Sequence, residues 1–439
     1  MKNYLKWTIV FFLLGVIAYL FSPSIKRLLA ADGYLSARIA LMYLSGTLGI
    51  ILMSAAVLIS ARFSFINKLF GGLDKAYEVH KSTAALGFAF GLIHFLMSFS
   101  NRLMIKFNVI PEPAHSANPL TGTILSFYKA GYAFLEPAFI VLIIIVAIAI
   151  IRKVPYHIFK YTHKIIPILY LQIALHAFTV PFRGGWVDTI GGYILQGMVI
   201  FGAIGAVFSL FNLTGIKHRY KGIISLKEKV TSDIIHIKVK LDNVENFNFS
   251  AGEFVFLKFS HSLEPHPFSV AGFNKENKEL EFYIKESGDF TSKLYDKLAD
   301  NSKVVVEGPY GEFNFSDTSK NQVWIAGGIG ITPFLAKLNA LADNKANISI
   351  DLIYSKIGDT PFDDMLNNMC EKAGVTLHMV DTQKEGLLTY NKIKEIAPNI
   401  TSSSIWFCGP IGFRQAVFKG LKEDNIDLNL FHFDNFSFR

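Results

Sequence analysis

Residues 326–334 have the sequence AGGIGITPF, and this stretch decides the fold of the C-terminal half of the chain. It follows a short apolar run at 323–326 and leads into the helical pattern of 333–341, so it joins a strand to a helix. Thr332 stands where a helix cap is expected, and Pro333 falls in the first helical turn, where proline is favoured. The stretch therefore predicts a strand–turn–helix unit of an α/β domain.

Three glycines in this turn, Gly327, Gly328 and Gly330, suit a phosphate group. Glycine lets the backbone come close to a ligand, and the N-terminus of the following helix attracts negative charge. The spacing differs from the Gly-x-Gly-x-x-Gly pattern of dinucleotide-binding Rossmann domains. The turn therefore predicts a nucleotide phosphate site that is not of the Rossmann type.

Two further strand-then-helix units follow this stretch. They lie at 348–354 with 363–372 and at 404–408 with 413–422. Strands that alternate with helices in this way form parallel sheets. The segment 317–439 is therefore expected to be an α/β domain with a parallel sheet.

The segment that precedes this domain has the pattern of short, half-buried strands. Its alternating apolar runs lie at 234–239, 254–259, 280–284 and 304–306. Such runs predict a small antiparallel β-barrel domain at 215–316. A short basic linker is expected at 217–221.

The first half of the chain is far more apolar. Over the whole chain 51% of the residues are hydrophobic and 18% are charged, an unusual balance for a soluble protein. Most of its six apolar stretches approach the ~20 residues that cross ~30 Å of hydrocarbon. They lie at 5–21, 39–59, 83–99, 132–151, 165–180 and 190–211. The chain is therefore expected to be multidomain, with a six-helix transmembrane bundle at 1–214.

The charged residues favour one orientation in the membrane. With the N-terminus inside, the inner loops hold more Lys and Arg than the outer loops, as cytoplasmic loops do. This places the C-terminal half in the cytoplasm and the protein in the cell membrane. The net charge of +8 comes without a dense basic run, so nucleic acid is not an expected partner. The segment 5–21 is expected to be a retained helix, with a signal peptide as the alternative.

Four histidines lie on two of the apolar stretches, His80 and His94 on the third and His163 and His176 on the fifth. An ionisable side chain at membrane depth is costly and usually functional. Each pair spans ~20 Å, most of the hydrocarbon thickness. Because histidine is an axial ligand of haem iron, the pattern predicts two stacked b-type haems. His80 with His163 would hold the inner one and His94 with His176 the outer one. The alternative is a set of bundle histidines or a proton relay.

The spacing on the fifth stretch requires a distorted helix. At ~100° per residue, the thirteen-residue step from His163 to His176 misses a common face by ~140°. Pro167 lies four residues after His163, where its ring clashes with the His163 carbonyl and removes a hydrogen bond. A break near His163 is therefore expected to turn this histidine toward its partner.

The segment His266-Pro267-Phe268-Ser269 resembles the flavin-binding segment of the ferredoxin-reductase-like superfamily, in the form found in ferric reductases and NADPH oxidases. The resemblance extends over nearly the whole chain, since the histidine pattern fits the membrane domain of that family. It implies that Ser269 hydrogen-bonds the FAD flavin near its reactive N5 atom. The three preceding residues would line the flavin ring.

Further motifs carry the resemblance in the same order along the chain. Gly288, Thr291 and Ser292 match the element that holds the FAD phosphates, and Thr291 is expected to cap a helix that runs to about residue 298. The sequence GPYG at 308–311 matches the turn that ends the flavin barrel. The AGGIGITPF stretch at 326–334 matches the loop that binds the nicotinamide dinucleotide.

The resemblance also implies residues around the nicotinamide. Cys408, Gly409 and Pro410 match the end of the last strand, which would place Cys408 near the nicotinamide. An aromatic residue near the C-terminus is expected to cover the flavin, and Phe436 is preferred to Phe438. The chain has only two cysteines, too few for a four-cysteine iron–sulfur cluster.

Together the motifs imply electron transfer from NAD(P)H through FAD and two haems to a small-molecule acceptor outside the lipid membrane. Dioxygen, giving superoxide, is the expected acceptor, and a ferric chelate is the alternative. A membrane-tethered flavoprotein reductase without haem, serving a partner protein, is a third possibility. Arg183, seven residues after His176, is expected beside the outer haem. Lys356 is expected to meet a 2′-phosphate, which slightly favours NADPH. The sequence indicates no oligomeric state.

Overall fold

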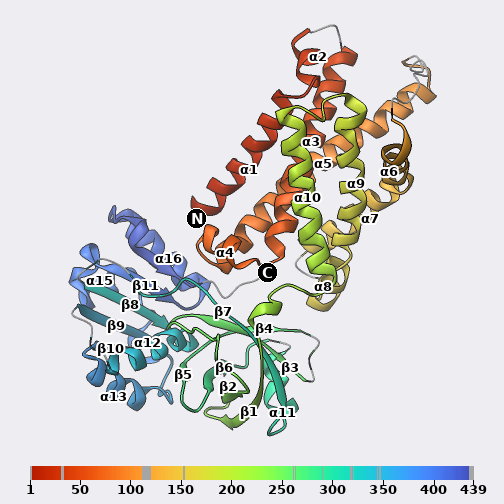
Figure 1. Cartoon of the computed structure of the whole chain (residues 1–439). Coiled ribbons are helices and arrows are strands. Elements are labelled where there is room, and N and C mark those ends of the chain that lie inside the picture. The colour runs from red at the N-terminus through yellow and green to blue at the C-terminus, as the bar shows by residue number, and fades with distance from the viewer. Residues whose placement is uncertain are drawn as a thin grey trace. The chain divides into compact units, whose positions relative to one another are not determined.

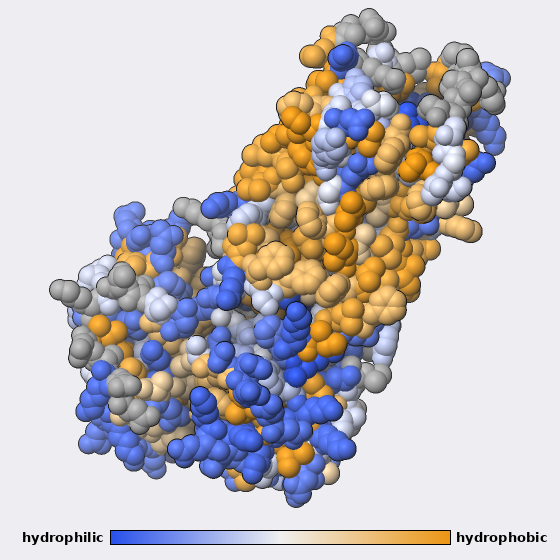
Figure 2. Space-filling view, viewed as in Figure 1, coloured by the Kyte–Doolittle hydropathy of each residue, from blue (hydrophilic) through white to orange (hydrophobic). Residues whose placement is uncertain are grey.

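The computed structural model describes residues 2–30, 34–110, 120–151, 154–260, 262, 264–288, 290–316, 319, 321–343, 345 and 348–434. The chain divides into two compact units, Met1–Thr214 and Gly215–Arg439. The first unit is helical and the second contains two sheets (Figure 1). In Figure 2 apolar residues dominate the visible surface of the first unit and hydrophilic residues that of the second.

The first unit consists of ten helices in its described part. They are α1 (Lys2–Leu20), α2 (Ser24–Ala30), α3 (Tyr34–Ser60), α4 (Ser64–Phe70), α5 (Leu73–Lys106), α6 (Gly122–Ala133), α7 (Leu135–Ile150), α8 (Tyr156–His163), α9 (Ile166–Gly184) and α10 (Ile190–Leu210). Four stretches are long and apolar enough to span a membrane, and a fifth is added if α6 and α7, bent by 44°, count as one. The apolar part of α1, Tyr4–Leu20, falls short of that length. The chain is thus a membrane protein with four or five such spans in its described residues.

Helix α3 lies at the centre of this unit and packs against α1, α5 and α10. Glycines allow the α3 and α5 backbones to come very close. A Cβ atom on Gly49 would lie 2.9 Å from the Gly91 nitrogen, and one on Gly87 would lie 2.9 Å from the Met53 nitrogen. This approach lets side chains of α5 reach backbone carbonyls of α3.

The first sheet of the second unit is antiparallel and has seven strands. They are β1 (Arg219–Lys229), β2 (Ile234–Leu241), β3 (Phe254–Phe259), β4 (His266–Ser269), β5 (Gly272–Asn274), β6 (Glu279–Lys285) and β7 (Lys303–Tyr310). Their order is β4-β3-β7-β1-β2-β6-β5, so the expected barrel takes the form of a curled sheet with two edge strands. Its inner face encloses one apolar core that includes Ile237, Leu257 and Phe282.

The second sheet is parallel, in the order β10-β9-β8-β11-β12. Its strands are β8 (Asn321–Gly327), β9 (Ser349–Lys356), β10 (Thr376–Asp381), β11 (Ser404–Cys408) and β12 (Phe431–Phe433). The main helices are α12 (Thr332–Asp343), α13 (Asp363–Ala373), α15 (Tyr390–Ile396) and α16 (Ile411–Glu423). Helices α12 and α13 share one core with the sheet, while α15 and α16 share another.

Short helical turns complete the second unit. They are η1 (Ile216–His218), η2 (Thr291–Lys293), α11 (Leu294–Lys297), η3 (Gly328–Ile331), α14 (Thr382–Glu385), η4 (Pro398–Ser402) and η5 (Leu428–Leu430). The linker expected at 217–221 was wrong in part, because Arg219 already begins β1 and pairs with Glu307 of β7. The alternating charges of β1 hid the strand, since its apolar residues are few.

Candidate functional site

The two histidines of α5 are held in the same way. The Nδ1 atom of His80 lies 2.8 Å from the Ala56 carbonyl oxygen, and Nδ1 of His94 lies 2.8 Å from that of Met42. A carbonyl only accepts, so each ring donates through Nδ1, and in the neutral ring the Nε2 atom is then the one without a proton. Metal-binding histidines are oriented by such a hydrogen bond on the other ring nitrogen.

His163 is the last residue of α8, and the helix is broken at Lys164 and Ile165 before α9 begins. The break that Pro167 predicts is therefore present. It brings the His163 ring to 6.4 Å from the His80 ring, measured between centres, with the planes at 69°. A metal bonded at ~2 Å to one nitrogen of each ring would place the ring centres ~6 Å apart. The two rings are thus at the separation that a shared metal needs.

His176 lies within the continuous part of α9 and is close enough to His94 for an electrostatic interaction between the rings. Its ring meets the edge of Tyr132 at 4.6 Å. Among the described residues, the buried Nδ1 atoms of His163 and His176 have no hydrogen-bond partner. Gly46 of α3 packs directly on the other outer ring, since a Cβ there would lie 2.7 Å from Nδ1 of His94.

These four side chains fit haem as a donor set. Haem iron needs only axial ligands from the protein, and histidine is a usual one. In the described part of the chain, no three His, Cys, Asp or Glu side chains gather as a metal site would require. A pair of imidazoles in an apolar bundle therefore suits a metal that already carries its other ligands, as the iron of haem does.

Two arginines near the outer histidines differ in their surroundings. Arg183 is exposed, donates to the Tyr128 hydroxyl at 2.5 Å and lies 5.2 Å from that ring. Arg38 is only 8% exposed and is held by Asn101, by Ser100 and by the Met97 carbonyl. The prediction that Arg183 lies beside the outer haem remains a prediction, because the contacts of this side chain are with Tyr128. Arg38 was missed, since its buried position on α3 depends on packing against α5.

The His266–Ser269 segment forms β4, an edge strand that pairs with β3. Ser269 is 7% exposed, and its hydroxyl has no hydrogen-bond partner among the described residues. Burying a hydroxyl without a partner is costly, so this atom suits a ligand that hydrogen-bonds it. The His266 ring stacks on Phe290 at 3.5 Å. Pro267 and Phe268 pair with Phe256 and Val255 of β3.

The expected phosphate turn at Gly288 is built differently from the prediction. Thr291 does not cap a helix; its hydroxyl accepts from the backbone N–H groups of Ser287 and Gly288, at 3.0 and 3.1 Å. Only a short 3₁₀ turn and the four-residue α11 follow. The Ser292 N–H donates to the Gly288 carbonyl at 3.0 Å. The prediction of a cap was wrong because the Thr291 hydroxyl turns back to the loop that follows β6.

The glycine turn and the end of β11 lie against each other. A Cβ on Gly330 would lie 2.3 Å from the Cys408 carbonyl oxygen, and one on Gly327 would lie 2.9 Å from the Pro410 ring. Gly328 has a φ of +55°, which favours glycine. The sequence motifs at 326–334 and 408–410 therefore form one surface, which includes Gly409 next to Gly327.

Two side chains of this surface differ from what was expected. Thr332 is the first residue of α12, and its hydroxyl donates to the Ile329 carbonyl at 2.7 Å instead of accepting from the helix. Pro333 follows it in the first turn, as expected. Cys408 is fully buried, and burial together with the nearby Asp434 charge raises the pKa of its thiol well above the ordinary value. It is therefore a neutral thiol.

Lys356 does not offer a free charge to a nucleotide. It ends β9, is 9% exposed, and its ammonium pairs with the carboxylate of Asp363 on α13. The structure therefore gives no support to the preference for NADPH that rested on this lysine. Phe436 lies outside the described residues.

One partly buried carboxylate near the β4 segment was also missed. The Glu253 carbonyl accepts from the Val270 N–H, directly after Ser269. Burial raises the pKa of Glu253 to about 7, opposed by the Ser250 N–H and assisted by Glu312.

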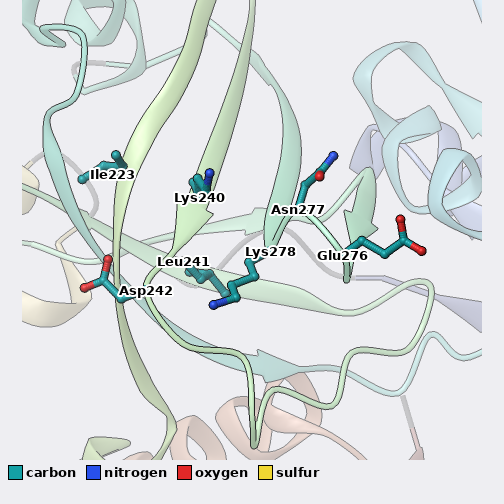
Figure 3. A pocket seen from close by; sticks show the side chains of 7 residues that line it. All are labelled: Ile223, Lys240, Leu241, Asp242, Glu276, Asn277 and Lys278. Atoms are coloured by element: carbon teal, nitrogen blue, oxygen red, sulfur yellow. The ribbon is translucent and has the colours of Figure 1, made fainter.

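The hollow in Figure 3 is lined by residues of β1, of β2 and the position after it, and of the turn before β6. It contains none of the predicted site residues.

Comparison with known proteins gives two family matches. Residues 45–174 match the ferric reductase like transmembrane component, and residues 222–314 match an FAD-binding domain. The first match includes His80, His94 and His163 and ends two residues before His176, and the second includes β4. The chain belongs to the ferric reductase and NADPH oxidase superfamily.

Three relatives show how this superfamily member compares with curated proteins. A glycine betaine monooxygenase reductase subunit from Chromohalobacter salexigens is 26% identical over 43% of this chain and 56% of its own length. Ferric reduction oxidase 8 of Arabidopsis thaliana is 27% identical over 44% of this chain and 26% of its own. A heavy chain of the superoxide-generating NADPH oxidase from Dictyostelium discoideum is 24% identical over 71% of this chain and 49% of its own. The chain thus spans about half the length of the first of these relatives.

Proposed function

We propose that this protein transfers electrons across the cell membrane, from cytosolic NAD(P)H through FAD and two b-type haems to a small acceptor on the outer face. The observation that carries the proposal is the 6.4 Å separation of the His80 and His163 rings. These rings come from helices that lie far apart in the sequence, and a helix break brings one toward the other. Two imidazoles placed in this way suit the axial positions of haem iron.

The membrane residues would hold and orient the haems. His80 with His163 would hold one, and His94 with His176 the other. Because the α3 carbonyls accept hydrogen bonds from Nδ1 of His80 and His94, each neutral ring would offer its second nitrogen, Nε2, to the iron. The buried guanidinium of Arg38 on α3 lies one turn before Met42, and it would suit an acidic group of the outer haem.

The second unit would supply the electrons. In the FAD domain, 215–316, the Ser269 hydroxyl would meet the flavin, and His266, Pro267 and Phe268 would line it. In the NAD(P)H domain, 317–439, the glycine turn would let the backbone approach the nucleotide phosphates beside Cys408. When bound, FAD takes the two electrons of a hydride together and haem iron accepts them singly, which is why both cofactors are needed.

Dioxygen is the proposed acceptor, with superoxide as the product. The alignment with the superoxide-generating oxidase supports it, because that alignment covers 71% of the chain. A ferric chelate is the second candidate, supported by the match of residues 45–174 to the ferric reductase component. Arg183, exposed near His176, would draw either a superoxide anion or an anionic chelate.

An assay on the purified full-length protein in lipid nanodiscs separates these acceptors. Superoxide formation is measured with NADH and with NADPH, in the absence and presence of ferric citrate. We expect superoxide at a rate that added iron does not change. Ferrous iron formed without superoxide would instead identify a ferric-chelate reductase.

A reductase without haem is tested by optical spectroscopy. The proposal requires a reduced-minus-oxidised spectrum with the Soret and α bands of two b-type haems per chain. A protein that contains FAD and is bleached by NAD(P)H but lacks these bands would be a tethered flavoprotein that serves a partner.

The proposed topology has six membrane segments and a cytoplasmic C-terminal half. In this topology α1 is a retained sixth span, and α6 with α7 forms a single bent one. Cysteine labelling of intact cells tests it, with single cysteines placed at Asn108, in the exposed turn after α5, and at Lys384. The impermeant reagent should modify the first position and leave the second unmodified until the cells are lysed.

A further inference from the structure

The two outer histidines are oriented by different means. His94 donates through Nδ1 to the Met42 carbonyl at 2.8 Å. His176 has no such bond, because its buried Nδ1 has no partner within the described part of the chain. A ligand ring without a hydrogen bond can rotate, and its orientation affects how it binds a metal. Another contact must therefore hold the His176 ring.

The last turn of α6 supplies that contact. The Tyr132 ring meets the His176 ring edge-on, with centres 4.6 Å apart and planes at 83°. This arrangement places the positive edge of one ring on the negative face of the other, a favourable geometry. Tyr128, one turn earlier, holds Tyr132 in turn, with ring centres 4.7 Å apart.

The same turn is docked on the α9 backbone at His176. A Cβ on Gly131 would lie 2.9 Å from the backbone nitrogen and Cα of His176, so only glycine fits here. Gln172, one turn before His176, donates to the carbonyls of Ala130 and Gly131, both at 2.9 Å. Two independent features therefore fix the distance between α6 and His176.

We propose that the last turn of α6 is the positioning element of His176, in which the Tyr132 ring takes the place of the carbonyl that orients His94. Gly131 and Gln172 set the distance, and the Arg183–Tyr128 hydrogen bond anchors the outer end of the stack. Tyr132 does not bind the cofactor; it acts through His176. The inference rests on the proposed function, because it concerns how His176 presents its ring to haem.

Electron paramagnetic resonance of the oxidised full-length protein tests this inference. The position of a low-spin haem signal depends on the orientation of its two imidazole rings. The outer signal is identified as the one that a His94→Leu variant lacks. In Tyr132→Leu we expect the outer signal to shift and its midpoint potential to change, while the inner signal stays in place. Tyr132→Phe keeps the ring, so its outer signal and midpoint potential should be those of the wild type.

Two further variants keep the test decisive. Phe178→Leu removes a ring two residues from His176 that contacts Phe182, and it should leave the outer signal unchanged. Gln172→Met removes the donor with little change in size, and it should shift the outer signal less than Tyr132→Leu does. Should Tyr132→Leu fail to assemble, an unchanged outer signal in Gln172→Met would overturn the inference.

The outcomes for the two proposals differ. A wild-type protein without haem overturns the proposed function. A wild-type protein with two haems, whose outer signal and potential are the same in Tyr132→Leu, overturns only the role of Tyr132. Equal shifts in Tyr132→Leu and Tyr132→Phe also overturn it, because the hydroxyl and not the ring would then be responsible.

Discussion

The inner and outer histidine pairs differ in how the second histidine is placed. In both pairs the α5 histidine donates to a carbonyl of α3 at 2.8 Å. His163 reaches its partner because the helix breaks directly after it, whereas His176 lies in an unbroken helix under a neighbouring one. The comparison teaches that a broken helix can turn its own ligand, while an intact helix needs a second element to hold the ring.

Removal of one α5 histidine from each pair should have the largest effect. His80→Leu and His94→Leu should each lose one haem of two, and each should stop reduction of the outer acceptor while NAD(P)H still bleaches the flavin. The reason is that an axial ligand cannot be replaced by an apolar side chain. The haem-to-protein ratio and the acceptor assay measure this. Full haem content in either variant would remove that histidine from the site.

The broken helix can be tested by Pro167→Ala. Alanine restores the N–H group and removes the clash with the His163 carbonyl, which favours a continuous helix by ~3 kcal/mol. We expect His163 to turn away, so that the inner haem binds up to ~100-fold more weakly and the outer haem is unaffected. Haem titration of the apoprotein measures the two affinities.

Pro181→Ala is the matched control, because Pro181 lies inside α9 and beyond His176. It should leave the inner haem unchanged. If Pro167→Ala binds the inner haem as the wild type does, the break has another cause.

The outer histidine pair can be tested at Gly46, which packs on His94. A Cβ here would lie 2.7 Å from Nδ1 of His94, so Gly46→Ala should push the ring away from the Met42 carbonyl. Loss of such a bond typically weakens metal binding by ~10-fold or more. We expect the outer haem alone to be affected, as haem titration would show. Gly197→Ala, where a Cβ meets nothing within 4 Å, is the control, and an equal effect there would contradict this explanation.

Local patterns explain which parts of the fold could be predicted. Alternation identified β2, β3, β6 and β7, and the histidine spacing with Pro167 identified the break in the fifth span. These features can be read within one strand or one helix of the sequence. The membrane segments were placed by hydropathy, but their ends were not, and α5 extends well beyond the apolar stretch at both ends.

The missed features depend on contacts between distant segments. Tyr132 of α6 meets His176 of α9, and Gly131 is needed only because α6 touches α9 there. Lys356 seemed free in sequence, yet the start of α13 places Asp363 beside it. A local sequence pattern does not predict which distant segments will come into contact, so these residues could not be assigned from the sequence.

A histidine of the second unit sharpens the contrast between neutral and charged rings. His236 on β2 lies 2.6 Å from a Glu228 oxygen through Nδ1 and 2.7 Å from a Glu281 oxygen through Nε2. It also stacks on Tyr283, with ring centres 4.5 Å apart. Two carboxylate partners require both nitrogens to donate, so this ring carries a positive charge and cannot bind a metal. In the described part of the membrane unit, Nδ1 of each histidine has a carbonyl partner or none, so no carboxylate holds a second proton on these rings.

The smallest expected effect is the pH dependence of this clamp. Burial lowers the pKa of His236, but the hydrogen bonds and charges of Glu281 and Glu228 outweigh it, so the folded pKa is raised above the usual 6.5. The contribution of His236 to the free energy of unfolding is therefore complete below about pH 6.5 and is lost as pH rises through the folded pKa. It amounts to ~1.4 kcal/mol for each tenfold gain in proton affinity on folding. The melting temperature of the protein should therefore fall between about pH 6 and 9, and in His236→Gln it should depend less on pH over this range. Glu281→Gln should reduce the slope, because one of the two charges that hold the proton is then gone; an unchanged slope in both variants would show that the ring is neutral like those in the membrane.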